Sequence, residues 1–252
     1  MEIKVIAGDI AKITTEAIVL YIFEGTELLD SDIAGIDRAL DGAIRRLVGQ
    51  GEIKGKPNEV TLIHSLGKIP ADRVVIAGLG KKPEFTLERI RDAAAVVCRQ
   101  LQRKKVATAA TALSGAGIEG VSLEPAAQAV TEGVVLGGYS FRRHMTGEAE
   151  TGEVKELTIV TAGEADLSSL ERGSRRGKVM GEATNLARDM VNEPANFMTP
   201  GHMAAAAVKL AGTYGLEVDV LEREQMQELG MGGAAGGGPG ELAATKVHNP
   251  AL

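Results

Sequence analysis

The stretch Ala187–Pro200, which reads ARDMVNEPANFMTP, gathers polar turn-forming residues around the carboxylate of Glu193. A glutamate acts as a general acid or base when a partner group or a metal ion lies beside it. No histidine, second carboxylate or metal-ligand spacing lies directly beside Glu193. The pattern is better explained by a joint between two helices, because Pro194 would end the first helix and Thr199 would cap the second.

The histidines and the single cysteine do not indicate a catalytic or metal-binding site either. The 4 histidines (His64, His144, His202 and His248) are scattered and form no HExxH pattern, so none is assigned as a metal ligand. Cys98 lies on the apolar stripe of a predicted helix, which favours a small buried hydrophobe over a nucleophile. GxSxG is absent as well. The residues alone therefore assign no catalytic and no metal-binding position, and the substrate-binding positions stay unknown.

Three further clusters are interpreted as ordinary surface features. Gly78–Phe85 (GLGKKPEF) follows a strand and precedes a helix, but it fits neither GxGxxG nor GxxxxGK[ST], so a tight turn with two surface lysines is expected. Phe141–Met145 (FRRHM) is the most basic spot and is too small for a nucleic-acid footprint. A cluster of aspartates with arginines nearby indicates a solvated helix face. Its members are Asp30, Asp32, Asp37 and Asp41.

Composition narrows the class of protein and its partners. Apolar residues make up 44% of the 252 residues and charged residues 25%, as in an ordinary globular protein with a real core. The net charge of −6, without a block of Lys or Arg, disfavours nucleic acid as a partner. No apolar run is long enough for a membrane span, and no signal pattern precedes the first strand. A single cysteine excludes an internal disulfide, so we expect a cytoplasmic location.

Strands and helices alternate along the chain, which predicts an α/β sheet covered on both faces. Periodicity places strands at residues 2–8, 16–23, 58–67, 72–80, 106–113, 157–162 and 216–222. It places helices at residues 33–48, after the cap Thr86, and at 124–136, 170–191, 200–214 and 223–229. The polar segment 163–173 is typical of a linker, and the Gly-rich end of the chain is typical of a loop.

The elements after residue 163 begin a second α/β unit that remains small. A helix and one strand cannot bury a domain's worth of apolar surface. We therefore expect the segment Leu170–Leu229 to be marginally stable and to expose an apolar stripe. The stripe consists of Leu186, Met190, Val208 and Leu210.

The opening stretch also carries a resemblance. NLARDMVNEPANFMTP resembles the start of the catalytic domain in the leucyl aminopeptidase (cytosol aminopeptidase) family of two-metal exopeptidases. Residues 51–97, 123–144 and 216–232 resemble the same family in order and spacing, so the likeness covers about Glu2 to Gly232. It implies a macro-like N-terminal domain with a mixed sheet covered by helices at residues 1–163. A linker helix and an incomplete catalytic-domain fragment would follow at 164–232, and a Gly-rich tail at 233–252.

The resemblance also implies a function for the intact family. Its members remove N-terminal residues from peptide substrates with two divalent metals, manganese or zinc, and form homo-hexamers. Paired metal ions lower the pKa of a bridging water and polarise the scissile carbonyl. The family's ligand motifs, of the types GKGxxFDxGG and NTDAEGR, do not occur in this sequence. No residue here inherits a metal or catalytic role, and the chain alone is expected to be inactive.

Two questions stay open. Family members continue after the position of Gly232 with a segment of the type LLGVAQGSxxPPKFIxLxY, and the codons of residues 234–252 permit such a peptide one base out of frame. A one-base slip near Gly233 is one explanation of the tail, and a natural Gly-rich end is the other. The second question is whether the chain acts as a non-enzymatic binding or assembly module, with a macro-like ligand such as ADP-ribose or with DNA.

Overall fold

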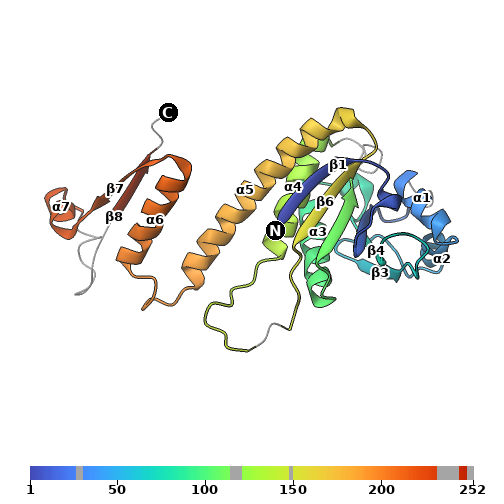
Figure 1. Ribbon diagram of the computed structural model, residues 1–252, viewed down its shortest axis with the longest axis horizontal. Helices are drawn as coiled ribbons and strands as arrows, with labels where there is room; N and C mark the ends of the chain where they lie inside the picture. Colours follow the sequence, from blue (N-terminus) through green and yellow to red (C-terminus); the bar gives the residue numbers. More distant parts are fainter. Residues whose placement is uncertain (27–30, 114–120, 148–149, 232–243, 249–252) are drawn as a thin grey trace. The chain divides into compact units, whose positions relative to one another are not determined.

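The computed structural model describes residues 1–26, 31–113, 121–147, 150–231 and 244–248 (Figure 1). The chain divides into two compact units, Met1–Asn185 and Leu186–Leu252, which are described separately.

A sheet with the strand order β1-β6-β5-β2-β4-β3 organises the first unit. Neighbouring strands are parallel except β3, which runs antiparallel to β4, so the expected mixed sheet is confirmed. The strands are β1 (Glu2–Ala7), β2 (Ala17–Ile22), β3 (Val60–His64), β4 (Arg73–Gly78), β5 (Thr108–Ala112) and β6 (Glu156–Thr161). Every strand expected in this part of the sequence is present.

Helices cover both faces of this sheet. They are α1 (Ser31–Ala39), α2 (Ala43–Gly49), α3 (Leu87–Arg103) and α4 (Leu123–Gly137). Successive β2 side chains point to opposite faces: Val19 packs in the cluster under α3 and α4, while Ile18 and Leu20 pack in the cluster under α1 and α2. A central strand buried on both sides explains why β2 is apolar almost throughout.

Residues 33–48 form two helices rather than the single predicted one. Asp41 and Gly42 adopt left-handed backbone angles, with φ of 54° and 76°, and end α1 before α2 begins. The Asp37 carboxylate then accepts a hydrogen bond from the Arg45 backbone N–H at 3.0 Å. Asp37 is 2% exposed, so its assignment to a solvated face is wrong. It is a buried acceptor for the start of α2.

Most of the segment 163–173 is helical rather than a linker: residues Glu164–Asp166 form a 3-10 turn, and the helix predicted at 170–191 begins three residues earlier. Helix α5 (Leu167–Asn192) begins there and packs beside α4 (Figure 1). A Cβ atom at Gly173 would lie 2.1 Å from the Glu124 carbonyl oxygen, and one at Gly177 would lie 2.5 Å from that of Gln128. The backbones of α4 and α5 therefore come into contact at these glycines. Because glycine has no side chain, this contact leaves no pattern of apolar residues in the sequence.

The second unit contains α6 (Pro200–Tyr214), β7 (Glu217–Leu221), α7 (Arg223–Glu228) and β8 (Ala244–His248). Thr199 caps α6 by accepting from the His202 N–H at 3.4 Å, and Pro200 occupies the first turn, as expected. β8 pairs antiparallel with β7, so the interpretation of the whole tail as a loop is wrong. Other parts of the tail, residues 232–243 and 249–252, lie outside the described residues.

Candidate functional site

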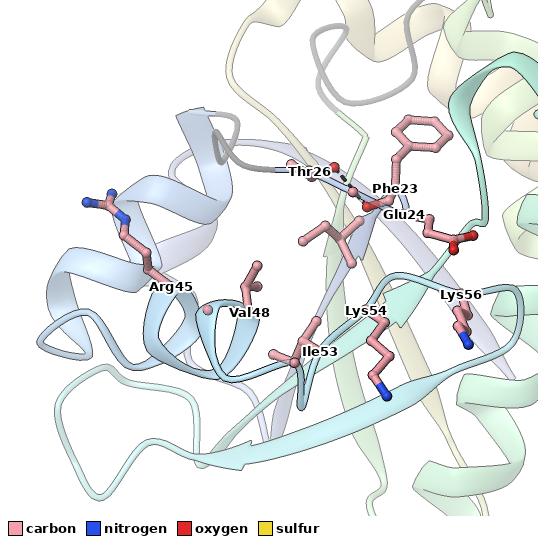
Figure 2. Close-up of a pocket in the computed structure, with 12 residues that line it drawn as sticks. Phe23, Glu24, Thr26, Arg45, Val48, Ile53, Lys54 and Lys56 are labelled. Atoms are coloured by element: carbon pink, nitrogen blue, oxygen red, sulfur yellow. Dashed lines mark hydrogen bonds between the residues drawn. The ribbon is translucent and has the colours of Figure 1, made fainter.

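A pocket with a volume of about 610 Å³ opens at the carboxyl end of β2 (Figure 2). Its walls are the turn after β2, the last turn of α2 and the loop that leads from α2 to β3. The volume falls within the range of about 300 to 1,000 Å³ that is usual for small-molecule sites.

The connections of the strands explain why a cavity forms here. From β2 the chain passes through α1 and α2 to β3 and β4 on one side of β2, and α3 then carries it to β5 on the other side. β2, β4 and β5 are parallel, so their carboxyl ends share one edge of the sheet. Such a reversal in strand order leaves a crevice at the carboxyl edge, where open α/β sheets bind ligands.

Glycines let the loop after α2 lie directly on the strand ends. A Cβ at Gly78 would lie 2.0 Å from the Lys56 carbonyl oxygen, and one at Gly55 would lie 2.5 Å from that of Phe23. Gly55 also has a φ of 72°, which favours glycine. The Glu59 carboxylate accepts from the backbone N–H groups of Lys54 at 3.0 Å and Lys56 at 3.1 Å. The loop is thus held at both lysines.

Apolar side chains lie at the centre of the pocket and charged side chains around it. Figure 2 shows Val48 and Ile53 pointing toward the middle, with Lys54 and Lys56 on the adjoining loop. Both lysines are exposed. Arg45 on α2 and Glu24 after β2 complete the charged lining. The sequence alone did not indicate this site, because two lysines separated by a glycine in a loop form no recognised motif.

The candidate residues from the sequence do not converge on this pocket. Glu193 lies between α5 and α6, where its backbone N–H donates to the Asp189 carbonyl at 3.0 Å. The histidines are spread over β3, the Phe141–Met145 segment, α6 and β8. His202 contacts the Thr199 hydroxyl through Nδ1 at 2.8 Å. Glu193 and His202 belong to the second unit, whereas the pocket belongs to the first.

Potential metal ligands lie apart from one another. In the described parts of the chain, no three His, Cys, Asp or Glu side chains come together in a way that could hold a metal ion. A pair of divalent metals needs several such donors. The described residues therefore do not fit the two-metal centre that the family resemblance implies.

The other candidates take the structural positions expected for them. Cys98 is fully buried in α3, and burial raises the pKa of its thiol to about 12, so it is confirmed as a buried small side chain. In the Gly78–Phe85 turn, Lys81 and Lys82 are exposed on the surface. Asp41 pairs with Lys68 at 2.6 Å, and this hydrogen bond lowers the pKa of the Asp41 carboxyl. Asp30 lies outside the described residues.

Comparison with known families matches both units of the chain. Residues 19–148 match the sequence model of the cytosol aminopeptidase family, N-terminal domain, and residues 185–246 match that of the family's catalytic domain. The second match extends past Gly232, where the resemblance in the sequence was expected to stop.

Individual relatives agree with these matches. A probable cytosol aminopeptidase of Alkaliphilus oremlandii is 36% identical over 238 residues, which cover 94% of this chain and 47% of the relative. One from Geobacter sulfurreducens is 35% identical over 234 residues, which cover 92% of this chain and 46% of the relative. The chain thus spans about half the length of the curated relatives that it matches.

Solved structures give the same fold. The bottromycin maturation enzyme BotP in complex with Mn superposes with a TM-score of 0.71 at 26% identity, covering 94% of this chain and 46% of BotP. A mutant of tomato leucine aminopeptidase superposes with a TM-score of 0.80 at 21% identity, covering 99% of this chain and 51% of its own. Within the described residues, no helix is both long and apolar enough to cross a bilayer. From the two domain matches, this chain belongs to the cytosol aminopeptidase family.

Proposed function

We propose that this chain is part of a two-metal aminopeptidase that releases N-terminal residues from peptides, and that by itself it does not catalyse this reaction. Family membership supports the first half of the proposal. The second half rests on one observation: the described residues bring together no donor set for a metal ion. Without a metal-bound water, the scissile carbonyl has neither an activated nucleophile nor a Lewis acid.

The cofactors, assembly and location of the intact enzyme follow the family. We assign it two divalent ions, manganese or zinc, and the manganese in the BotP structure supports the first of these. We also propose a homo-hexamer in the cytoplasm. In such an assembly the first unit would form contacts between subunits, and the residues that bind the metal ions would catalyse the reaction.

A peptidase assay tests the proposed inactivity. The purified chain is incubated with leucine p-nitroanilide and with a leucyl dipeptide, each with added manganese or zinc. We expect no release of product above a blank that contains metal alone, whereas the Alkaliphilus oremlandii relative, assayed in parallel, should show whether the conditions suit the family. Turnover that follows the chain through purification and disappears with a chelator would refute the proposal.

A binding role for the first unit is the second candidate, and the pocket beside β2 favours it. A macro-like ligand such as ADP-ribose is one form of this role, and a thermal-shift titration checks it. DNA is the less favoured form, because the chain carries a net charge of −6. A gel shift that weakens as salt rises would reverse that preference.

A further inference from the structure

We infer that the outer edge of β3, together with Leu66 in the turn that follows it, is a contact surface for a second copy of this chain. The two copies pair antiparallel through their β3 strands, about a two-fold axis at Leu62. This inference does not depend on peptidase activity. It goes beyond the homo-hexamer proposed above because it names the surface, and it applies equally to a dimer.

β3 is the last strand of the sheet and has an open backbone edge (Figure 1). The Ser65 N–H, directly after the strand, donates to the Asp72 carbonyl at 3.0 Å. Alternate residues of an antiparallel strand direct their backbone groups to the same side, so Thr61 and Ile63 face β4 as Ser65 does. In the described part of the chain, no further strand pairs with the other side. The backbone N–H and C=O groups on that side belong to Val60, Leu62 and His64.

The two edges of the sheet differ in how they are protected against pairing. β1, at the opposite edge, carries Lys4, whose ammonium group pairs with Glu156 at 2.6 Å and lies 3.7 Å from Glu2. Charged side chains on an edge strand discourage other chains from pairing with it. β3 consists of Val-Thr-Leu-Ile-His, without lysine, an acidic residue or proline, and its register with β4 is continuous. The edge of β3 is therefore open to a further strand.

A second copy of β3 fits this edge in a symmetric register. With the two-fold axis at Leu62, Val60 of each copy lies opposite His64 of the other, so the open backbone groups of both strands gain partners. Val60 and Leu62 are partly buried against the cluster under α3 and α4, and Ile63 against the cluster under α1 and α2. Pairing covers the rest of these side chains. It also sets no like charges of the two strands opposite each other, although each chain has a net charge of −6.

Leu66 gives the edge an apolar anchor. It is 85% exposed, the largest fraction for any large apolar side chain among the described residues. Its φ is 53° and that of Gly67 is 78°, and the Lys68 N–H closes the turn by donating to the Ser65 carbonyl at 3.1 Å. A turn with two positive φ angles favours Asn-Gly, whereas a bulky leucine is strained there. Leucine thus lowers the stability of the single chain, and its exposed side chain is available to a partner.

Sedimentation of the whole chain over a range of concentrations tests the inference. We expect reversible self-association with a Kd of about 1 to 100 µM, because pairing of one short strand makes a small interface. The Kd should change little with salt, because β3 has no lysine, arginine or acidic side chain. Leu66→Asn should weaken the association at least about tenfold, since each copy loses a leucine from the contact. At a concentration where the chain is monomeric, this variant should melt about 2 to 4 °C higher, because asparagine relieves the strain.

Lys105→Asn is the matched control. Lys105 is exposed after the end of α3, and its φ of 54° is nearly that of Leu66. Asparagine should raise the melting temperature there as well, but it should leave the association unchanged. His64→Pro is a second test variant, because it removes an N–H that points away from β4. It should weaken the association and keep the far-UV circular dichroism of the wild-type chain.

Amide exchange followed by NMR reports on the strand itself. The amides of Val60, Leu62 and His64 should be protected at high concentration and should exchange at least about tenfold faster after dilution to the monomer. The amides of Thr61 and Ile63, which bond to β4, should stay protected at both concentrations. This alternation distinguishes pairing through β3 from association through any other surface.

Three results would overturn the inference. A chain that remains monomeric up to about 1 mM has no such contact. Equal association of the wild-type chain and Leu66→Asn would place the contact on another surface. Protection of the outward amides that does not depend on concentration would mean that the chain covers its own edge. None of these measurements involves peptide cleavage, which the assay with leucine p-nitroanilide tests separately.

Discussion

At the scale of single residues, the burial of Cys98 makes the free energy of unfolding depend on pH. Its thiol is fully buried, and burial raises the pKa from 9.0 to about 12. Because the unfolded chain ionises this thiol first, its contribution to stability is complete below pH 9 and is lost as the pH rises toward 12. We expect the free energy of unfolding to fall by about 1 kcal/mol for each pH unit in that window.

The measurement is denaturant unfolding of the wild-type chain and C98A between pH 8 and pH 10.5. The C98A variant should be less stable at every pH, because the substitution leaves a small cavity. Its free energy of unfolding should also fall less steeply with pH, because the thiol that ionises is gone. Tyr21 has a pKa that burial also raises, and it titrates in both proteins. Parallel curves for the two proteins would contradict the assignment.

Asp37 is predicted to matter far more for stability than a surface ion pair. Its carboxylate is buried, accepts from the Arg45 N–H and begins α2. Asp37→Ala leaves that N–H without its acceptor and should lower the free energy of unfolding by about 1 to 3 kcal/mol. Lys68→Ala, which removes an exposed partner of Asp41, should cost less than about 1 kcal/mol. Equal losses in urea unfolding would contradict this ranking.

The sequence reveals some of these residues and not others, for physical reasons. Cys98 lies in a regular apolar stripe, so its burial follows from helical spacing alone. The burial of Asp37 does not follow from helical spacing, because it depends on the break between α1 and α2 at Asp41 and Gly42. Lys54 and Lys56 line the candidate pocket only because the loop after α2 lies against the end of β4. The spacing of residues within one helix can be read from a short stretch of sequence. A hydrogen bond across a helix break, or a pocket between elements, depends on residues that are brought together only by folding.

At the scale of elements, glycine sets the distance between α3 and α4. A Cβ at Gly133 would lie 2.3 Å from the Arg91 carbonyl oxygen, so Gly133→Ala forces the two helices apart. We expect it to lower the free energy of unfolding by about 1 to 3 kcal/mol. A Cβ at Gly35 in α1 would meet no atom within 4 Å, so Gly35→Ala should raise stability by about 0.5 to 1 kcal/mol. Thermal melts of both variants should show a lower melting temperature for Gly133→Ala and a higher one for Gly35→Ala.

Close helix packing also explains which elements the sequence predicts well. Helices α3 and α6 have clear caps at Thr86 and Thr199, and both begin where expected. Helix α5 was predicted at 170–191 and begins three residues earlier, at Leu167, although its buried residues are mostly small: Leu170 is followed by Gly173, Ser174 and Gly177. Small residues give almost no hydrophobic periodicity, although they allow the closest contact between helix backbones.

At the scale of the whole molecule, the two units differ in how much they bury. The first unit holds two large apolar clusters, one on each face of its sheet. Among the described residues of the second unit, the buried apolar side chains are Ala204, Ala211 and Met226. Of the apolar stripe expected there, Val208 is 48% exposed, and Leu186, Met190 and Leu210 are half-buried.

Hydrogen exchange should follow this division. Local opening needs little free energy where few apolar side chains are buried, so amides of α6 and β7 should exchange at least about tenfold faster than those of β2 and β4. The part of α5 up to Asn185 belongs to the first unit and touches α4 through Gly173 and Gly177, so it should share the slow exchange of the sheet. Mass spectrometry of peptides from both parts of the chain resolves the boundary. Equal protection of α6 and β2 would mean that the second unit is stabilised by contacts beyond those described. Early exchange across 170–185 would instead support the expectation that the whole segment Leu170–Leu229 is marginally stable.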